Sequence, residues 1–378
     1  MSQLLEAIDL VKRFPVGKKL LHAVDGVNFH IDRGETVGLV GESGCGKSTL
    51  VRLLTRTLDL TSGHIRFHGN GIGLIPARAM ADHPLRREIQ MVFQDPTDSL
   101  NPRYTARDTI AESARLLTDT RDAAARRAQV EEAADHVGLP RELLDRYPHQ
   151  LSGGQKARVG IARAIVVKPR LLILDEPTAA LDVSVQAVIL QLLDRLKREM
   201  GMSFLFVSHD LNVVRLLCDR VMVMYLGQIV ETGPAQEVFA RPLHPYTRAL
   251  IASLPGGLAH GQATDADLLI GGDPQSPIDP DAHRCRLLGR CPRGADRCAT
   301  QAPPLREIFR GRSAACHFVA PSENEIYVDA ALAMQGLNPG TERRAEIART
   351  FELLAEMAHR VEAVPLPDDV EPAAQYRP

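Results

Sequence analysis

The sequence predicts an α/β fold organised around a mainly parallel sheet. Short apolar runs typical of buried strands recur along the N-terminal part of the chain, and segments with the apolar spacing of helices separate most of them. This alternation is the pattern of a sheet whose strands are joined by helical crossovers. One early strand also runs into a glycine-rich turn that is followed by a helix.

The individual elements follow from these patterns. We expect strands at Leu4–Leu10, Gly26–Ile31, Glu35–Val40, Ile89–Phe93, Leu171–Leu174, Ser203–Val207 and Arg220–Tyr225. We expect helices at Lys47–Leu58, Ala123–Val137, Gln155–Val166, Val183–Met200, Asn212–Leu217 and Thr341–Val361. Gly227, Gly233 and Pro234 predict turns after the last strand, and Pro234 favours a short helix through Ala240.

Composition indicates an ordinary globular protein, because 44% of the residues are apolar and 24% are charged. The formal net charge is −2, so no overall basic field would attract nucleic acid, and we expect no nucleic-acid partner. The longest apolar runs are far too short to span a bilayer, and the first residues lack the pattern of a signal peptide. We therefore expect a cytoplasmic chain that reaches a membrane only through a partner.

The length of 378 residues indicates more than one region. We expect a large domain over residues 1–254, a smaller extension over residues 255–320 and a tail over residues 321–378. Residues 255–280 are rich in Gly, Pro and Asp, which predicts a linker or an irregular wrap. The predicted helix in the tail either packs on the protein or binds a partner.

A glycine-rich segment from Gly41 to Ser48 fits a phosphate-binding loop, with the order glycine, four residues, glycine, lysine and serine. Its backbone N–H groups and the start of the next helix would face the phosphates. Lys47 can reach the β- and γ-phosphates as a catalytic group, and the Ser48 hydroxyl can bind Mg²⁺. The alternative is a chance glycine-rich turn. The expected nucleotide contacts are Gly41, Ser43, Gly44, Cys45, Gly46, Lys47, Ser48 and Thr49.

Two carboxylates follow the buried strand Leu171–Leu174 directly. Asp175 would hold Mg²⁺ through its water shell, and Glu176 would polarise the attacking water. Two acids after a strand could instead cap a helix, but the phosphate loop favours the catalytic interpretation. The two motifs together fit many nucleotide hydrolases, including kinases and GTP switches.

The segment Leu151-Ser152-Gly153-Gly154-Gln155, just before the acidic strand, resembles the signature of the ABC ATPase family. The resemblance implies a RecA-like core with an antiparallel β subdomain and a helical subdomain. It also implies that Ser152, Gly153, Gly154 and Gln155 act on ATP held by the phosphate loop of a second ATPase subunit. A free helix N-terminus with a serine hydroxyl suits this role.

Other family elements follow in the family's order. Gln94 matches the glutamine loop that contacts Mg²⁺ and water, Asp182 matches the D-loop that crosses the dimer, and His209 matches the switch histidine near the γ-phosphate. Phe14 matches the aromatic residue that stacks on adenine, with a core position as its alternative. The resemblance thus implies ATP and Mg²⁺ as cofactors, Ser48, Gln94 and Asp175 as the magnesium set, and Glu176, His209 and Lys47 as the catalytic set.

Further segments resemble the oligopeptide/dipeptide import branch of this family, which also includes nickel importers. They are Ser99-Leu100-Asn101-Pro102-Arg103 and Pro242-Leu243-His244-Pro245-Tyr246-Thr247. Cys45 and the first segment are more similar to the F-type subunit than to the D-type subunit. The resemblance implies a D-type ATPase partner, two transmembrane permease subunits, an extracellular solute-binding protein, and a peripheral position on the cytoplasmic face of the membrane.

A cluster of four cysteines, Cys285, Cys291, Cys298 and Cys316, resembles the C-terminal extension of that branch. In members with all four, they can hold a 4Fe-4S cluster. Four thiolates also suit zinc, although the spacing does not match the paired cysteines of common zinc ribbons. Free thiols are the third interpretation. Against the importer as a whole stand a non-transport ABC ATPase that acts on nucleic acid or ribosomes and a regulatory module that moves no solute.

Overall fold

The computed structural model describes residues 3–95, 97–118, 120, 122–254, 270–309, 311–319, 323–337 and 339–362. The chain forms two compact units, Met1–Val319 and Ala320–Pro378. Most of the linker expected over residues 255–280 lies outside the described residues, and the boundary between residues 254 and 255 stays a prediction.

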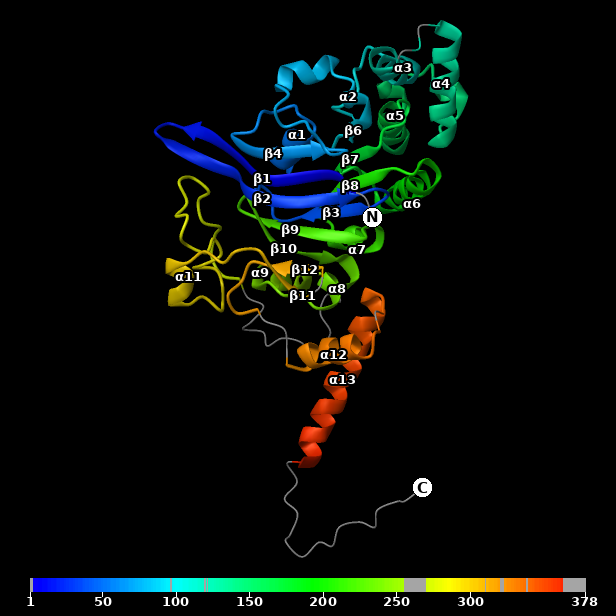
Figure 1. Cartoon of the computed structure of the whole chain (residues 1–378). Coiled ribbons are helices and arrows are strands. Elements are labelled where there is room, and N and C mark those ends of the chain that lie inside the picture. The colour runs from blue at the N-terminus through cyan, green and yellow to red at the C-terminus, as the bar shows by residue number, and fades with distance from the viewer. Residues whose placement is uncertain are drawn as a thin grey trace, which may run out of the picture. The chain divides into compact units, whose positions relative to one another are not determined.

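An eight-stranded sheet forms the centre of the first unit, in the order β11-β12-β10-β9-β3-β8-β7-β6 (Figure 1). The strands from β9 to β6 in this order pair in parallel, which confirms the α/β fold, and β10, β12 and β11 add an antiparallel edge. The bounds are β3 Thr36–Val40, β6 Ile89–Val92, β7 Leu171–Asp175, β8 Ser203–Val207, β9 Arg220–Tyr225, β10 Gln228–Pro234, β11 Arg306–Phe309 and β12 Arg312–Ala314.

The turns predicted at Gly233 and Pro234 are wrong, because both residues belong to β10. This strand pairs with β9 on one side and with β12, from much later in the chain, on the other. The turn expected at Gly227 is present between β9 and β10.

A second sheet is antiparallel, in the order β2-β1-β4-β5. Its strands are β1 Gln3–Val16, β2 Lys19–Asp32, β4 Ser62–Phe67 and β5 Asn70–Gly71. One apolar cluster joins this sheet to the main one, since it includes Leu5, Ile31, Leu39, Leu50 and Ile173. The phosphate-loop region therefore lies between the two sheets.

The helices of the first unit are α1 Lys47–Leu54, α2 Leu85–Glu88, α3 Ala106–Leu117, α4 Ala123–His136, α5 Gly153–Ile165, α6 Val183–Met200, α7 Leu211–Leu217, α8 Ala235–Ala240, α9 Pro245–Ala252 and α11 Asp296–Thr300. Short 3₁₀ turns cover Ala77–Asp82, Arg141–Leu143 and Pro148–Gln150. Helix α1 ends four residues before the predicted Leu58, and Arg56 takes a left-handed backbone conformation with φ 54°.

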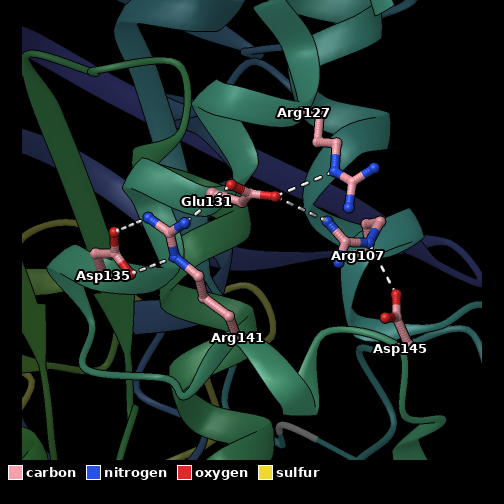
Figure 2. Close-up of polar contacts among 6 residues, drawn as sticks. All are labelled: Arg107, Arg127, Glu131, Asp135, Arg141 and Asp145. Carbon is pink, nitrogen blue, oxygen red and sulfur yellow. Dashed lines mark hydrogen bonds and ion pairs between the residues drawn. The ribbon is translucent and has the colours of Figure 1, made fainter. Parts of the chain in front are cut away.

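Helices α3, α4 and α5 pack together as a helical subdomain (Figure 1). Buried Ile110, Val130 and Val159 belong to the core cluster that these helices share with the main sheet. On the outer face, ion pairs join α3 and α4 to the segment that follows them (Figure 2). These pairs are Arg107–Asp145 at 2.8 Å, Arg107–Glu131 at 3.7 Å, Arg127–Glu131 at 3.1 Å, Arg141–Glu131 at 3.1 Å and Arg141–Asp135 at 2.6 Å.

The second unit contains α12 Glu323–Met334 and α13 Thr341–Glu362. Helix α13 matches the helix predicted over Thr341–Val361. The rings of Tyr327 and Phe351 stack with centroids 5.0 Å apart, so these two helices contact each other. No helix in the described ranges is both long and apolar enough to cross a membrane.

Candidate functional site

A cavity of about 410 Å³ opens beside the phosphate loop. Residues that the sequence predicted at this site form most of its wall, namely Phe14, Ser43, Gly44, Cys45, Gly46, Lys47, Ser48, Thr49, Gln94, Glu176 and His209. The structure thus brings together residues from β1, the phosphate loop, the segment after β6, and the ends of β7 and β8. Phe14 is partly exposed on this wall and does not belong to the core.

The phosphate loop connects β3 to α1 in a conformation that requires glycine. Gly41 has φ 153° and Gly46 has φ 113°. A Cβ atom would lie 2.2 Å from the Met224 carbonyl oxygen at Gly41, and 2.2 Å from the Ala23 carbonyl oxygen at Gly46. Such contacts are impossible, so any side chain at either position would displace the loop.

The start of α1 is prepared for an anion. Gly46 is its N-cap residue and supplies no side-chain hydrogen bond, so the first N–H groups of α1 receive no side-chain cap. The buried Lys47 ammonium donates hydrogen bonds to the carbonyl oxygens of Gly41, at 2.7 Å, and Glu42, at 3.0 Å. The lysine charge is therefore held inside the loop, where phosphates would lie.

Two of the predicted polar residues, Gln94 and His209, lie beside the carboxylate of Glu176. The Gln94 side-chain amide donates to a Glu176 carboxylate oxygen at 2.9 Å, and His209 Nδ1 lies 3.1 Å from the same oxygen. Glu176 has a left-handed backbone with φ 48°, a conformation that often marks functional sites in residues other than glycine. Its N–H donates to the Val207 carbonyl oxygen at 2.9 Å, which fixes the carboxylate between the ends of β7 and β8.

Asp175 is the last residue of β7 and is 8% exposed. Burial raises the pKa of its carboxyl group, and the neighbouring Glu176 raises it further, while Lys47 and Arg52 act in the opposite direction. A buried carboxylate whose charge is only partly balanced fits a divalent cation. Asp175 does not line the cavity itself.

The signature residues lie apart from this cavity, since none of them lines it. Ser152 is exposed and caps α5: its hydroxyl accepts from the Gln155 N–H at 3.3 Å, and the Gln155 side chain accepts from the Ser152 N–H at 2.9 Å. A Cβ atom on Gly154 would lie 2.7 Å from a Val185 methyl group, and one on Gly153 would lie 3.3 Å from Leu181. A side chain at Gly154 would therefore displace Val185, whereas a side chain at Gly153 would need only a small shift of Leu181.

Asp182 also lies outside the cavity wall. Its carboxylate caps α6 by accepting from the Val185 N–H at 2.9 Å and from the Ser184 hydroxyl at 2.7 Å. These hydrogen bonds hold the pKa of Asp182 below its ordinary value. The D-loop is thus anchored to the same helix, α6, against which Gly154 packs.

Sequence reasoning missed several residues of the cavity wall: Leu21, His22, Ala23, Leu226, Gly227 and Pro277. Pro277 comes from the C-terminal extension, and its carbonyl oxygen accepts from the His22 N–H at 2.9 Å. Leu21 and Ile278 form an isolated β-bridge beside it. The sequence singles out Pro277-Ile278-Asp279-Pro280 through its resemblance to the family. It does not indicate that this segment contacts His22.

The four clustered cysteines line one small cavity of about 10 Å³, between the segment after β10 and the C-terminal extension. All four are free thiols. Burial raises the pKa of Cys285, of Cys316 and of Cys291, the last to about 11. Among the described residues, no group of three or more His, Cys, Asp or Glu side chains is arranged to hold a metal ion. Neither the expected 4Fe-4S cluster nor the zinc alternative is therefore supported by these observations.

Three family models match successive parts of the chain. The ABC transporter model matches residues 24–179, and the model of the oligopeptide/dipeptide transporter C-terminal region matches residues 230–298. A third model, described as 1-carboxybiuret hydrolase subunit AtzG-like, matches residues 327–376. The last match was not anticipated from the sequence and falls in the second compact unit.

Individual proteins agree with the first two matches. The chain is 44% identical to the oligopeptide transport ATP-binding protein OppF of Escherichia coli over 84% of its own length and 97% of that protein. It is 42% identical to YkfD of Bacillus subtilis over 85% and 97% of the two chains. Among solved structures it is similar to the dimeric ATP-binding cassette MJ0796 bound to ADP and Pi, with TM-score 0.56, 29% identity, and coverage of 61% and 98%. It is also similar to cbiO1 of Clostridium perfringens, with TM-score 0.56, 33% identity, and coverage of 64% and 92%.

Proposed function

We propose that this chain, which belongs to the ABC transporter family of ATP-binding subunits, hydrolyses ATP to drive the import of oligopeptides or dipeptides through a partner permease. The observation that carries the proposal is the meeting of Gln94, Glu176 and His209 at the mouth of a complete phosphate loop. The relatives named as oligopeptide transport proteins support peptides as the solute.

The chemistry assigns a role to each group. Lys47 and the N–H groups of the phosphate loop would bind the phosphates. Ser48, Gln94 and Asp175 would hold the magnesium ion, which would offset negative charge on the β- and γ-phosphates. Glu176 accepts a proton from the attacking water. His209, 3.1 Å from Glu176, keeps that carboxylate oriented and faces the γ-phosphate. Phe14, which lines the cavity, would stack on adenine.

The signature completes the site of a second subunit. The start of α5 faces outward and carries Ser152, Gly153, Gly154 and Gln155. Asp182, at the start of α6, would belong to the same interface with the second subunit. We propose a D-type paralogue as the ATPase partner and this chain as the F-type subunit. Two permease subunits and an extracellular solute-binding protein complete the importer, at whose cytoplasmic face this chain binds.

Reconstitution tests this proposal. The chain, co-expressed with the permease and ATPase partner and placed in proteoliposomes with the binding protein, should show ATP-dependent uptake of short peptides. Uptake of nickel without peptide would support the related importer for a small solute instead. Failure to assemble with any permease, together with ATPase activity stimulated by DNA or ribosomes, would contradict the importer and support a non-transport ATPase.

A second proposal concerns the four cysteines, which we propose hold a 4Fe-4S cluster. They line one buried cavity. The backbone at Leu287, Arg293 and Phe318 lowers the pKa of Cys285, Cys291 and Cys316, although burial raises it more strongly. A lower pKa favours the thiolate that iron requires. In a cluster each thiolate binds a different iron, so the four sulfur atoms need not converge on one ion.

Anaerobic purification with iron and sulfide analysis tests the cluster. The protein should contain both elements in proportion to the chain, Cys298→Ser should lose them, and Cys218→Ala, outside the cluster, should keep them. Stoichiometric zinc without iron, or no metal in protein purified anaerobically, would refute the proposal.

A third proposal concerns the second unit, which we propose binds a separate hydrolase chain. The matching model is that of a hydrolase subunit, and α12 and α13 are rich in exposed apolar side chains. These are Ile326, Tyr327, Met334, Leu353, Leu354 and Met357, which are between 53% and 85% exposed. A pair of helices with so much exposed apolar surface is typical of a protein-binding module.

Co-purification with mass spectrometry tests the third proposal. A hydrolase should be retained by the full-length chain and lost both from a chain that ends at residue 319 and from Leu354→Glu. Arg343→Ala, which removes only an exposed ion pair with Glu346, should retain it. Recovery of importer subunits alone, or self-association through the tail, would contradict the proposal.

A further inference from the structure

We propose that Arg290, in the C-terminal extension, is a positioning residue of the ATP site that acts on the phosphate loop through Glu42. The inference rests on hydrogen bonds between residues far apart in the sequence. It assigns the extension a part in ATP binding and is independent of whether the nearby cysteines hold metal.

Glu42 is the second residue of the phosphate loop and is held at three points. Its N–H donates to the Tyr246 hydroxyl at 2.8 Å, and its carbonyl oxygen accepts from the Lys47 ammonium at 3.0 Å. Its carboxylate receives both terminal nitrogens of Arg290, each at 3.3 Å. The position of Glu42 therefore influences the position of Lys47, which must reach the phosphates.

Arg290 is well placed to fix Glu42, since its side chain is only 11% exposed. It also donates to the Tyr225 hydroxyl at 3.2 Å and lies over that ring at 5.8 Å. Tyr225 in turn packs against Tyr246, with ring centroids 4.6 Å apart. Arg290, Tyr225 and Tyr246 thus form one group of contacting side chains that hydrogen-bonds to Glu42 of the loop.

The turn that carries Arg290 is itself fixed to the cavity wall. One turn earlier, buried Arg286 hydrogen-bonds to the Leu226 carbonyl oxygen and to Asp25. The adjacent Gly227 donates its N–H to the Cys45 carbonyl oxygen at 2.8 Å, within the phosphate loop. Arg290 therefore contacts the loop directly, and Arg286 is linked to the loop through Leu226 and Gly227. Because the contacts are charged and largely buried, they should hold the loop more firmly than surface ion pairs would.

The test is steady-state ATPase kinetics on the full-length chain in its assembled transporter. Arg290→Met should raise KM for ATP by roughly three- to tenfold with kcat changed less than about twofold, because one charge-assisted contact to the binding loop is lost. Glu42→Gln should do the same. The double variant should raise KM no more than either single variant, because both changes remove the same interaction.

Two further variants separate positioning from folding. Arg290→Lys keeps the charge and should recover part of the loss in KM. Arg297 lies in α11 of the same extension, and its side chain donates to the Gln301 side chain. Arg297→Met should leave KM unchanged. An unchanged KM in Arg290→Met would overturn the proposal, as would fully additive effects of the Arg290 and Glu42 changes. If Arg290→Met fails to fold, Arg290→Lys and Glu42→Gln still decide the question through their KM values.

Discussion

The two phosphate-binding segments of this chain are built in opposite ways. The loop from Gly41 to Ser48 lies between two sheets, and its Lys47 is buried and hydrogen-bonded to its own backbone. The signature at Ser152 begins an exposed helix, and its serine hydroxyl contacts only the cap of that helix among the interactions described. The first segment forms the wall of a cavity, whereas the second presents its groups outward.

This difference teaches how the site is divided. The buried loop can bind a nucleotide within its own chain. The start of α5 also has groups that can bind phosphate, but it faces outward and does not line the cavity beside the phosphate loop, so it is suited to a nucleotide held by another subunit. The start of this helix lies close to α6, since a Cβ atom added at Gly154 would lie 2.7 Å from Val185. Binding and hydrolysis should therefore respond separately to changes in the two segments.

The largest effect is expected at Glu176. Glu176→Gln keeps the shape of the side chain but removes the proton acceptor, so we expect kcat to fall by about a hundredfold or more while ATP still binds. Steady-state hydrolysis together with equilibrium binding of a fluorescent ATP analogue measures both quantities. Unchanged turnover would refute the assignment of Glu176 as the group that activates water.

The signature gives the second largest effect. Gly154→Val would force a side chain into Val185, which lies 2.7 Å from the added Cβ atom, and should tilt the start of α5. We expect hydrolysis to fall by about tenfold or more with little change in ATP affinity. Gly160→Ala is the matched control in the same helix, since nothing lies within 4 Å of its added Cβ atom. Equal losses in the two variants would contradict the account.

Asp175 gives a smaller effect, on stability. Burial raises the pKa of its carboxyl group, so the ionised form destabilises the fold at pH 7, and this cost disappears as the pH falls through the raised pKa. Asp175→Asn should stabilise the protein without nucleotide by about 1 kcal/mol at pH 7. The gain should shrink in acid, where the wild-type side chain is already protonated. Thermal melting at several pH values measures it, and a gain independent of pH would contradict this explanation.

The smallest effect is expected at Arg141, in the ion-pair network on the outer face of the helical subdomain. Arg141→Ala removes the ion pairs to Glu131 and Asp135 (Figure 2). Because Arg141 is 58% exposed, solvent screens these ion pairs, and we expect little change in the free energy of unfolding and unchanged ATP affinity. Chemical denaturation measures the first quantity. A large loss of stability would show that this network is more than a surface feature.

Local chemistry explains what the sequence could predict. The phosphate loop requires glycine at fixed spacing, so the motif also located β3 and α1, and the buried apolar run of β7 located Asp175 and Glu176. The predicted helix over Gln155–Val166 likewise begins within two residues of the observed start of α5 at Gly153. Each of these features depends on residues adjacent in the chain.

Contacts between distant residues explain what the sequence could not predict. Strand β10 was missed because its register depends on β9 and on β12 from the extension. Pro277 and Arg290 reach the ATP site from residues more than two hundred positions after the phosphate loop. The residues adjacent to them in the sequence do not indicate these contacts. An arginine next to a cysteine would ordinarily be interpreted as a surface residue.

The most direct test of the shared site is ATP-driven association with the ATPase partner, whether a paralogue or a second copy. In Glu176→Gln, where bound ATP persists, sedimentation velocity should show association when ATP is added. Adding Gly154→Val should abolish association while leaving the Kd for ATP unchanged. Association that survives the Gly154 change, or ATP binding that is lost with it, would contradict the conclusion that the signature acts on nucleotide held by another chain.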